Sequence, residues 1–493
     1  MMLQQEVHRR IARGSVLSFL SSLLSRGFSM AHSIVVARWL DPYRVGLFSL
    51  LNYVLGVAGA LSDLGLPAAA VKLIAEEEAR GKKGLKSLLI TLSTVMLLTA
   101  GLTGLLLVVL SDRLAALYRE PSLAFLFKVG AVLLVLSLLG GLLGGILQGV
   151  QRIEVLAVLG PAKGLTAFLA LLLLLPSFGL LGILMASMAA EIMGGLLAAR
   201  PLRQALSFCS GEPGRFAWSP LHRAFSLSFP IFLNGLLLWG TPWLVRSFLA
   251  STRGYQEVGV FQVADSFSRL LLLIPTAVAV PLLPAIAFSS TTSPAQASGV
   301  AQMTFRSTLL VTLPPARFFF LAAQPLVGFV YGSPYAEAGS LAAFLIMAVF
   351  FQSLGVILWS VLVGTGRVWA GLLIQLTSHM TLLALTFTLV PPFGLTGLGM
   401  AHLVASGLGL LLALTYTRTK LEIDLASSRA LLPLSLGGWL VAWGLYVTGK
   451  DGILQALLLA GGMLVWEGRR LTEEERSGLN GWIRRMPLWR AER

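Results

Sequence analysis

Several cationic side chains fall inside apolar stretches, where a charge is expensive. Arg26 lies eleven residues into a run that begins at Ser15, which is about 16 Å along a helix at about 1.5 Å per residue. Serines recur around it at spacings of three and four, which puts Ser22, Ser29 and Ser33 on one face of the helix. An ionisable side chain at membrane depth costs at least ~2.5 kcal/mol and usually faces a cavity. We therefore expect this face to line a polar cavity.

Other charges at similar depth favour the same interpretation. Gln262, Asp265 and Arg269 recur at spacings of three and four in a later run, and Arg317 follows a proline pair that is expected to break its helix. The guanidinium fork suits phosphate oxygens. Because these cations outnumber the acids at depth, we expect an anionic substrate. The remaining cations assigned to the cavity are Lys163 and Arg246.

These charges also admit other roles. Internal pairing is the alternative to substrate binding, above all between Asp265 and Arg269 at i, i+4. Arginine stays charged and cannot carry a coupling proton. The side chains that could bind H+ or Na+ as a coupling ion are Asp63, Glu191, Asp265 and His379, although His379 is also explained as a satisfied polar residue at a helix contact. No metal site or other cofactor is predicted, because the single cysteine, Cys209, leaves no thiolate cluster.

The elements that carry these residues are expected to be transmembrane helices. The 493 residues are 56% hydrophobic and only 12% charged, whereas soluble domains average about 25% charged residues. Apolar runs recur along the whole chain, each long enough to cross a hydrocarbon core of about 30 Å. We predict an all-α polytopic membrane protein of about fourteen spans. The spans are placed near 15–38, 46–66, 87–110, 123–147, 155–175, 178–199, 224–249, 258–287, 303–330, 341–363, 368–390, 394–417, 430–448 and 452–468.

Two motifs recur at an offset of 215 residues. The segment 176–186 reappears as 391–401, and the segment 147–152 reappears as 362–367. Shared membrane-turn chemistry is the alternative explanation. Six spans in each repeat would insert both repeats in the same sense and relate them by an axis along the membrane normal, as in secondary transporters. Weaker matches pair Arg38 with Arg246, Val45–Phe48 with Val258–Phe261, and Tyr118 with Tyr331.

Charge and repeats together predict the domain organisation. Lysines and arginines gather in the loops on the side of the N-terminus and in the tail, so both termini are expected in the cytoplasm. The tail suits a helix on anionic lipid or a solvated segment. No basic domain accounts for the net charge of +15, which argues against nucleic acid as a partner. The predicted parts are 1–14, an N-lobe 15–200, a linker 201–223, a C-lobe 224–417, two further helices 418–468 and a basic tail 469–493.

Glycines 140, 141, 144 and 145 form overlapping GxxxG pairs. In membrane helices this pattern is typical of close helix packing. We therefore assign these glycines no chemistry.

Several segments resemble a known group of transporters. Ser25–Leu40 followed by Val45–Phe48 resembles the opening of polysaccharide-repeat-unit flippases of the Wzx type, within the multidrug/oligosaccharidyl-lipid/polysaccharide exporter superfamily. Asp63–Pro67 is similar to the spore-cortex branch of that superfamily. Tyr331-Gly332 and Gly364–Arg367 resemble its second half. The resemblance covers roughly residues 15–417.

The resemblance implies a fold and an activity. It implies two pseudo-symmetric six-helix lobes in a V around a central cavity, which move an undecaprenyl-pyrophosphate-linked oligosaccharide from the cytoplasmic to the outer leaflet of a bacterial inner membrane by alternating access. In lipid II flippases two extra helices form a groove for the lipid tail, and functional cations lie in the segments that hold Arg26 and Arg269 here. Those flippases also carry an arginine and an acid where this chain has His32 and Ser33. This difference favours another lipid-linked glycan of the envelope, such as O-antigen, capsule or exopolysaccharide, over peptidoglycan. The expected partners are that substrate, the bilayer and a polysaccharide polymerase.

Two other functions compete with this one. A multidrug or cation antiporter of the same superfamily would need acidic residues in the cavity, and the cavity predicted here is cationic instead. A membrane glycosyltransferase or polymerase would need a sizeable external loop with acidic or histidine residues, and the external connections here are short. No Walker motif is present, so ATP is not the direct energy source. We therefore predict a transporter and not an enzyme.

Overall fold

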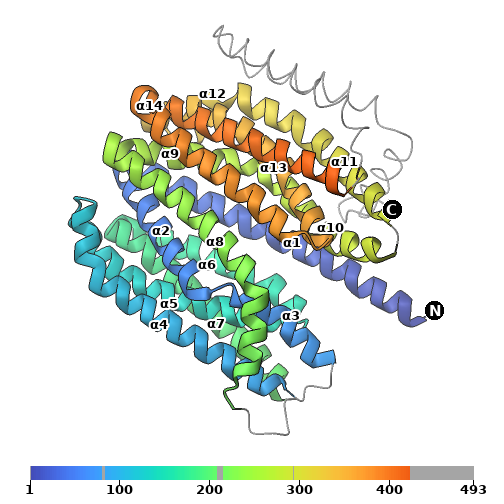
Figure 1. Cartoon of the computed structure of the whole chain (residues 1–493). Helices are drawn as coiled ribbons and strands as arrows, with labels where there is room; N and C mark the ends of the chain where they lie inside the picture. Colours follow the sequence, from blue (N-terminus) through green and yellow to red (C-terminus); the bar gives the residue numbers. More distant parts are fainter. Residues whose placement is uncertain (1, 80–83, 208–214, 293, 422, 424–493) are drawn as a thin grey trace, which may run out of the picture. The chain divides into compact units, whose positions relative to one another are not determined.

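A computed structural model describes residues 2–79, 84–207, 215–292, 294–421 and 423 of the chain, and the elements in these ranges are helical (Figure 1). The described chain forms two compact units. The first comprises the residues up to Ser266 together with Val330–Tyr335 and Val368–Ala401, and the second holds the rest. The predicted spans 430–448 and 452–468 and the tail 469–493 lie outside the described residues. The predicted boundary between the lobes at 201–223 stays a prediction.

The helices follow the predicted spans closely over most of the chain. The first nine are α1 (Met2–Trp39), α2 (Pro42–Asp63), α3 (Leu66–Ala79), α4 (Leu85–Leu117), α5 (Ser122–Gly149), α6 (Ile153–Phe178), α7 (Leu180–Ser207), α8 (Trp218–Arg253) and α9 (Tyr255–Ser268). The remainder are η1 (Arg269–Leu272), α10 (Leu273–Thr292), α11 (Pro294–Leu321), α12 (Ala323–Tyr331), η2 (Ser333–Tyr335), α13 (Ala338–Gly364) and α14 (Val368–Lys420).

Within the described residues, eight helices are long and apolar enough to cross a membrane, or up to nine if one bent pair counts as a span. The protein is therefore an all-helical polytopic membrane protein. The helix that carries Arg26, α1, is not one of the eight, in keeping with its serine-rich face. One of the eight is Val368–Lys420, although this helix is interrupted at Gly394.

The motif repeated at 176–186 and 391–401 forms the same turn twice. Gly179, between α6 and α7, has φ 55° and ψ −128°, and Gly394, within α14, has φ 57° and ψ −136°. Three residues later, Gly182 and Gly397 each lie against a backbone carbonyl of the preceding helix, 2.5 Å and 2.2 Å from an ideal Cβ position. Only glycine permits so close an approach. The predicted break between the spans 368–390 and 394–417 is confirmed.

The motif repeated at 147–152 and 362–367 is also one structure. It ends α5 in one repeat and α13 in the other, and both ends are Schellman turns with a left-handed residue. That residue is Gln151 (φ 57°) or Gly366 (φ 76°). The closing N–H bonds run from Arg152 to the Leu147 carbonyl (2.9 Å) and from Arg367 to the Leu362 carbonyl (2.7 Å). Two separate motifs with matching backbones support an internal repeat.

A third repeated segment brings equivalent glycines into contact. Gly46 follows the buried Val45 in α2, and Gly259 follows the buried Val258 at the same place in α9. An ideal Cβ on Gly46 would lie 1.9 Å from the Tyr255 carbonyl oxygen, and one on Gly259 would lie 1.9 Å from the Pro42 carbonyl oxygen. This reciprocity is what a twofold relation between α2 and α9 would produce.

The first helix of each repeat ends against a turn that belongs to the other repeat. Arg38, in the last turn of α1, donates to the Val330 carbonyl near the end of α12 (2.8 Å). Trp243, near the end of α8, donates its indole N–H to the hydroxyl of Tyr118, which follows α4 (2.8 Å). Tyr118 and Tyr331 are the pair that the sequence matched. The first helix of each repeat therefore makes a contact with the other repeat, although α1 packs mainly on α6 of its own repeat, whereas α8 runs beside α2 (Figure 1).

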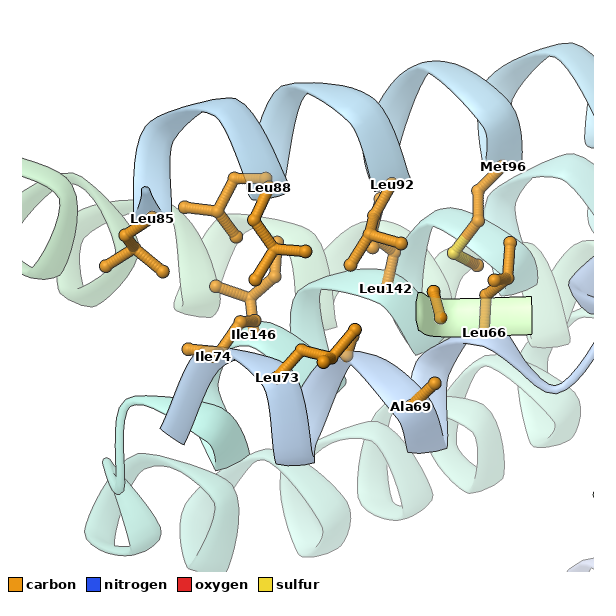
Figure 2. Close-up of a cluster of buried hydrophobic side chains, with 13 residues drawn as sticks. Leu66, Ala69, Leu73, Ile74, Leu85, Leu88, Leu92, Met96, Leu142 and Ile146 are labelled. Carbon is orange, nitrogen blue, oxygen red and sulfur yellow. The ribbon is translucent and has the colours of Figure 1, made fainter. Parts of the chain in front are cut away.

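The span predicted at 46–66 is interrupted after Asp63, and α3 continues the same candidate span to Glu77. Leu64 and Gly65 both have positive φ (51° and 70°), and Asp63 accepts the Gly65 N–H at 2.8 Å. From there α3 is fixed by leucines at helical spacing that pack on α4 and α5 (Figure 2). The cluster contains Leu66, Ala69, Leu73 and Ile74 of α3, Leu85, Leu88, Leu92 and Met96 of α4, and Leu142 and Ile146 of α5.

Two predicted helices break elsewhere than expected. The single span predicted at 258–287 is wrong, because η1 interrupts it at Arg269–Leu272. Pro275 follows directly, and a proline offers no N–H to the turn before it, which favours a tight 3₁₀ turn there. The break predicted at Pro314-Pro315 is also wrong, since α11 continues through both prolines. The chain bends by 74° only at Ala322. Membrane helices tolerate prolines where neighbouring groups satisfy the freed carbonyls.

Candidate functional site

Arg26 lies on an exposed face of α1 beside Ser22 and Ser29, at spacings of four and three. A different face packs on α6, where Ser25 donates to the Ser21 carbonyl (2.8 Å) and its hydroxyl lies 2.7 Å from an ideal Cβ on Gly160. Among the described residues, none forms a hydrogen bond or ion pair with the Arg26 side chain. The predicted polar stripe is thus separate from the packing stripe. Farther along the stripe, Ser33 is half-buried and hydrogen-bonded to Tyr331.

Arg246 is the centre of a buried polar network. Its side chain is 1% exposed, and its Nε donates to the Ser49 hydroxyl at 2.8 Å. Its Nη2 donates to Gln262 Oε1 and to Asp265 Oδ2, both at 3.0 Å. Ser49 in turn donates to the same Gln262 oxygen (2.7 Å). Three helices, α2, α8 and α9, therefore share one hydrogen-bonded cluster, which we name the Arg246 network (Ser49, Arg246, Gln262 and Asp265).

Aromatic rings cover the guanidinium of this network. The Arg246 Cζ lies 3.9 Å from the ring centroid of Tyr53 and 4.5 Å from that of Phe261. Rings at these distances attract the cation and keep water away from the ion pair with Asp265. Arg246 is therefore engaged within the protein, and binding to a substrate would require this network to open.

The Arg246 network differs from the predicted site in one ion pair and in two residues that the sequence did not identify. The sequence suggested Asp265 with Arg269 as the main internal pair, whereas the structure pairs Asp265 with Arg246. The sequence also did not single out Ser49 or Tyr53. One available signal was the repeat, because Ser49 and Gln262 each lie three residues after the matched glycines Gly46 and Gly259.

Lys163 and Glu191 form a second ion pair, between α6 and α7. The Lys163 Nζ lies 2.7 Å from Glu191 Oε2, with side chains 33% and 16% exposed. Glycines make room for both partners. An ideal Cβ on Gly140 of α5 would lie 2.4 Å from the Glu191 carboxylate, and one on Gly194 would lie 2.8 Å from the Lys163 stem.

The glycine-rich part of α5 is used in two ways. Gly145 lies against the backbone of Pro67 (ideal Cβ to carbonyl oxygen, 3.1 Å), as expected of helix packing. Gly140 instead accommodates a charged pair, a role that the pattern of glycines did not predict. An ideal Cβ on Gly141 or Gly144 meets no atom within 4 Å among the described contacts.

We expect this pair to be energetically coupled. Lys163→Met and Glu191→Gln should each lower stability, and the double variant should recover part of the loss, with a coupling free energy of about 1–3 kcal/mol. Equilibrium unfolding in mixed detergent micelles measures all four proteins. The matched control is Lys128 with Asp112, 3.2 Å apart but 43% and 72% exposed, for which we expect about 0–1 kcal/mol. Equal couplings for the two pairs would contradict the prediction.

The other predicted cations lie in the second unit. Arg269 is exposed at the first position of η1, and Arg317 is 4% exposed in α11, two residues after the proline pair. Both interact with other residues of the protein. Their predicted part in substrate binding stays a prediction.

Two candidates for ion coupling have local structural partners. Asp63 accepts the Gly65 N–H and so stabilises the left-handed turn between α2 and α3. His379 of α14 places Nδ1 2.8 Å from the Gln375 carbonyl in its own helix, as a satisfied polar residue would. In the described part of the chain, no group of three His, Cys, Asp or Glu side chains could hold a metal ion.

The arrangement of broken helices and repeated turns is that of a known class of membrane transporter. A solved inward-facing multidrug resistance MATE family transporter of the MOP superfamily matches with a TM-score of 0.70 and 14% identity, over 84% of this chain and 99% of that one. A lipid II flippase MurJ in an inward closed conformation matches with a TM-score of 0.68 and 15% identity, over 92% and 97%. Identities this low show the fold alone.

Sequence comparison defines the family. A family model described as "Polysaccharide biosynthesis protein" matches residues 11–289, more than half of the chain, so the protein belongs to this family. The probable low-salt glycan biosynthesis flippase Agl15 of Haloferax volcanii is 21% identical over 440 residues, which are 89% of each chain. The resemblance to this exporter superfamily is confirmed. The protein is a transporter of this family and not an enzyme.

Proposed function

We propose that this protein is a flippase that moves a lipid-linked oligosaccharide across a membrane. The observation that carries the proposal is Arg26, a cation on an exposed serine-rich face of α1, in a member of the polysaccharide biosynthesis family. The name of the Haloferax volcanii relative supports a glycan flippase. A guanidinium among hydroxyls suits the phosphate groups that join a glycan to its lipid.

The finer form of the proposal specifies the carrier and the architecture. The substrate is an undecaprenyl-pyrophosphate-linked oligosaccharide for cell-envelope polysaccharide, moved from the inner to the outer leaflet of a bacterial cytoplasmic membrane. About fourteen spans form two six-helix lobes in a V around the cavity. Two C-terminal helices accommodate the lipid tail, and both termini lie in the cytoplasm. A polysaccharide polymerase takes up the product.

The membrane potential favours this direction of transport. Moving negative charge outward gains about 2.3 kcal/mol per charge per 100 mV. H+ or Na+ coupling would add to this, with Asp63, Glu191, Asp265 and His379 as the candidate sites. Two of these acids, Glu191 and Asp265, already have a cationic partner in this conformation, so ion binding there would require the partner to move away.

A cation antiporter is the second candidate, favoured by the fold shared with MATE transporters. Such a protein needs carboxylates available to a cationic substrate. Here Asp265 and Glu191 are neutralised by Arg246 and Lys163. The pairing therefore favours an anionic substrate.

Removing the charge of Arg26 tests the proposal. We expect Arg26→Gln to reduce flipping of a fluorescent polyprenyl-pyrophosphate oligosaccharide in liposomes by about ten- to a hundredfold, because a charge-assisted contact of about 1.5–3 kcal/mol would be lost. Arg26→Lys should retain more activity, since its charge remains. The matched controls are Leu24→Ala, an exposed position on the same helix, and Arg152→Gln, an exposed arginine outside the stripe.

The outcomes separate the alternatives. Flipping by the wild type and both controls, with loss in Arg26→Gln, supports the flippase and the site together. Full flipping by Arg26→Gln would remove Arg26 from the site. Transport of organic cations by the wild type, with no flipping under any potential or ion gradient, would overturn the proposal in favour of the antiporter.

A further inference from the structure

The Arg246 network lies at a fixed depth below one end of the first unit. Ser49 is seven residues from the start of α2, Arg246 is seven residues from the end of α8, and Gln262 is seven residues from the start of α9. At about 1.5 Å per residue, each is about 10 Å below the end of its helix. The network is therefore a single layer across three helices.

Above this layer the same helices are in direct contact. The reciprocal approach of Gly46 and Gly259 leaves no room for a side chain between α2 and α9. At the helix ends the rings of Tyr43 and Tyr255 meet edge to face, 5.5 Å between centroids. Tyr255 also donates to the Tyr118 carbonyl (2.5 Å).

A carboxylate completes the rim of this end. The phenol of Tyr43 donates to Glu120, and so does the hydroxyl of Ser122 (2.6 Å). These two donors, the Ser122 hydroxyl first, lower the pKa of the half-buried Glu120 below its ordinary value. Glu120 is therefore ionised at neutral pH and remains an acceptor for Tyr43. The rim thus joins the turn after α4 to α2 and α9.

We propose that the Arg246 network is a latch that holds this end closed. The proposal rests on the proposed function, because a transporter that alternates access must open each end in turn. Ser49 belongs to the first predicted repeat, and Arg246, Gln262 and Asp265 belong to the second. Separating α2 from α8 and α9 breaks two bonds of the network, the one that Arg246 donates to Ser49 and the one that Ser49 donates to Gln262, while Arg246 keeps Asp265 as its partner.

The chemistry of the latch suits repeated opening. Arg246 remains paired with Asp265 when α2 leaves, so no buried charge is left without its counter-ion. Ser49 and Gln262 can each replace their mutual hydrogen bond with one to water. The cost in free energy is small, since hydrogen bonds contribute only about 0.5–1.5 kcal/mol each. The Tyr53 ring, which comes from α2, moves away with Ser49 and uncovers the guanidinium. Opening this end therefore exposes the Arg246 cation to the passage.

The test measures the distance between α2 and α9 directly, without a substrate. Arg44→Cys and Gln256→Cys are spin-labelled in a Cys209→Ser background, since both positions are exposed in the first turns of these helices. Double electron–electron resonance in nanodiscs gives the distance distribution. With an intact latch we expect mainly one short distance. In Ser49→Ala and in Arg246→Gln/Asp265→Asn we expect the ratio of long to short distances to rise about tenfold.

The control is a spin-label pair inside one repeat, at Asp112 and Lys128 of α4 and α5, whose distance should not change in any variant. A distribution between α2 and α9 that is the same in Ser49→Ala, in the double variant and in the parent would overturn the latch. A shift in the control pair as well would also overturn it, since the variants would then have loosened the whole unit. Because no substrate is present, failure of the flipping assay leaves this result intact.

Discussion

Arg246→Ala is expected to lower the free energy of unfolding by about 3–5 kcal/mol, since it leaves the buried Asp265 carboxylate without its cation. The variant also removes the three hydrogen bonds that the Arg246 guanidinium donates to Ser49, Gln262 and Asp265, none of them longer than 3.0 Å. Lost packing against Tyr53 and Phe261 adds to the effect. Equilibrium unfolding in mixed detergent micelles, followed by tryptophan fluorescence, measures the change.

The matched control for this prediction is Arg44→Ala. Arg44 faces Asp41 at 3.5 Å, but its side chain is 60% exposed, so we expect a loss of about 0–1 kcal/mol. Adding Asp265→Asn to Arg246→Ala should restore part of the stability, because no buried charge then remains. Equal losses for the two arginines would mean that the Arg246 network does not stabilise the fold.

Gly259→Ala is expected to be at least as damaging, at about 3 kcal/mol or more, because a methyl group has no space there. The new Cβ would lie 1.9 Å from the Pro42 carbonyl oxygen, and that atom is backbone and cannot rotate away. The helices α2 and α9 must then separate. Thermal unfolding in detergent and the α2–α9 spin-label distance report the two consequences, a lower melting temperature and a longer distance.

Gly101→Ala is the control, since Gly101 also lies inside a helix. An ideal Cβ on Gly101 of α4 meets no atom within 4 Å, so the variant should be neutral or more stable by up to about 1 kcal/mol. Gly46→Ala should behave like Gly259→Ala, since its Cβ would lie 1.9 Å from the Tyr255 carbonyl oxygen. If Gly259→Ala unfolds like Gly101→Ala, the close crossing of α2 and α9 is wrong.

Hydropathy predicted the described helices well because membrane helices satisfy their own backbone and need only length and apolar composition. The repeated segments went further and predicted which turns would be alike, at Gly179 and Gly394 and at Gln151 and Gly366. Helix breaks were harder to predict. The proline pair 314–315 is accommodated within α11, while the bend comes at Ala322, three residues before Pro325.

The sequence predicted which charged residues belong to the candidate site, but only partly which of them form ion pairs with each other. Charge at depth singled out Arg246, Asp265, Lys163 and Glu191, and the structure joins them as two ion pairs. Spacing along one helix suggested Arg269 for Asp265, because sequence shows only neighbours on the same helix. The structure gives Asp265 a partner from α8, Arg246, nineteen positions earlier. Polar groups with no charge, such as Ser49, carry too weak a signal to be found without the fold.

The contact of α1 with the second repeat has a consequence for how the protein is made. Arg38 meets its partner Val330 only after 292 further residues have been synthesised. At about 5–20 residues per second, this delay is about 15–60 s. Trp243 reaches Tyr118 after a separation of 125 residues. During biogenesis α1 can therefore pack on α6 long before Arg38 gains its partner, which comes only when about two thirds of the chain has been synthesised.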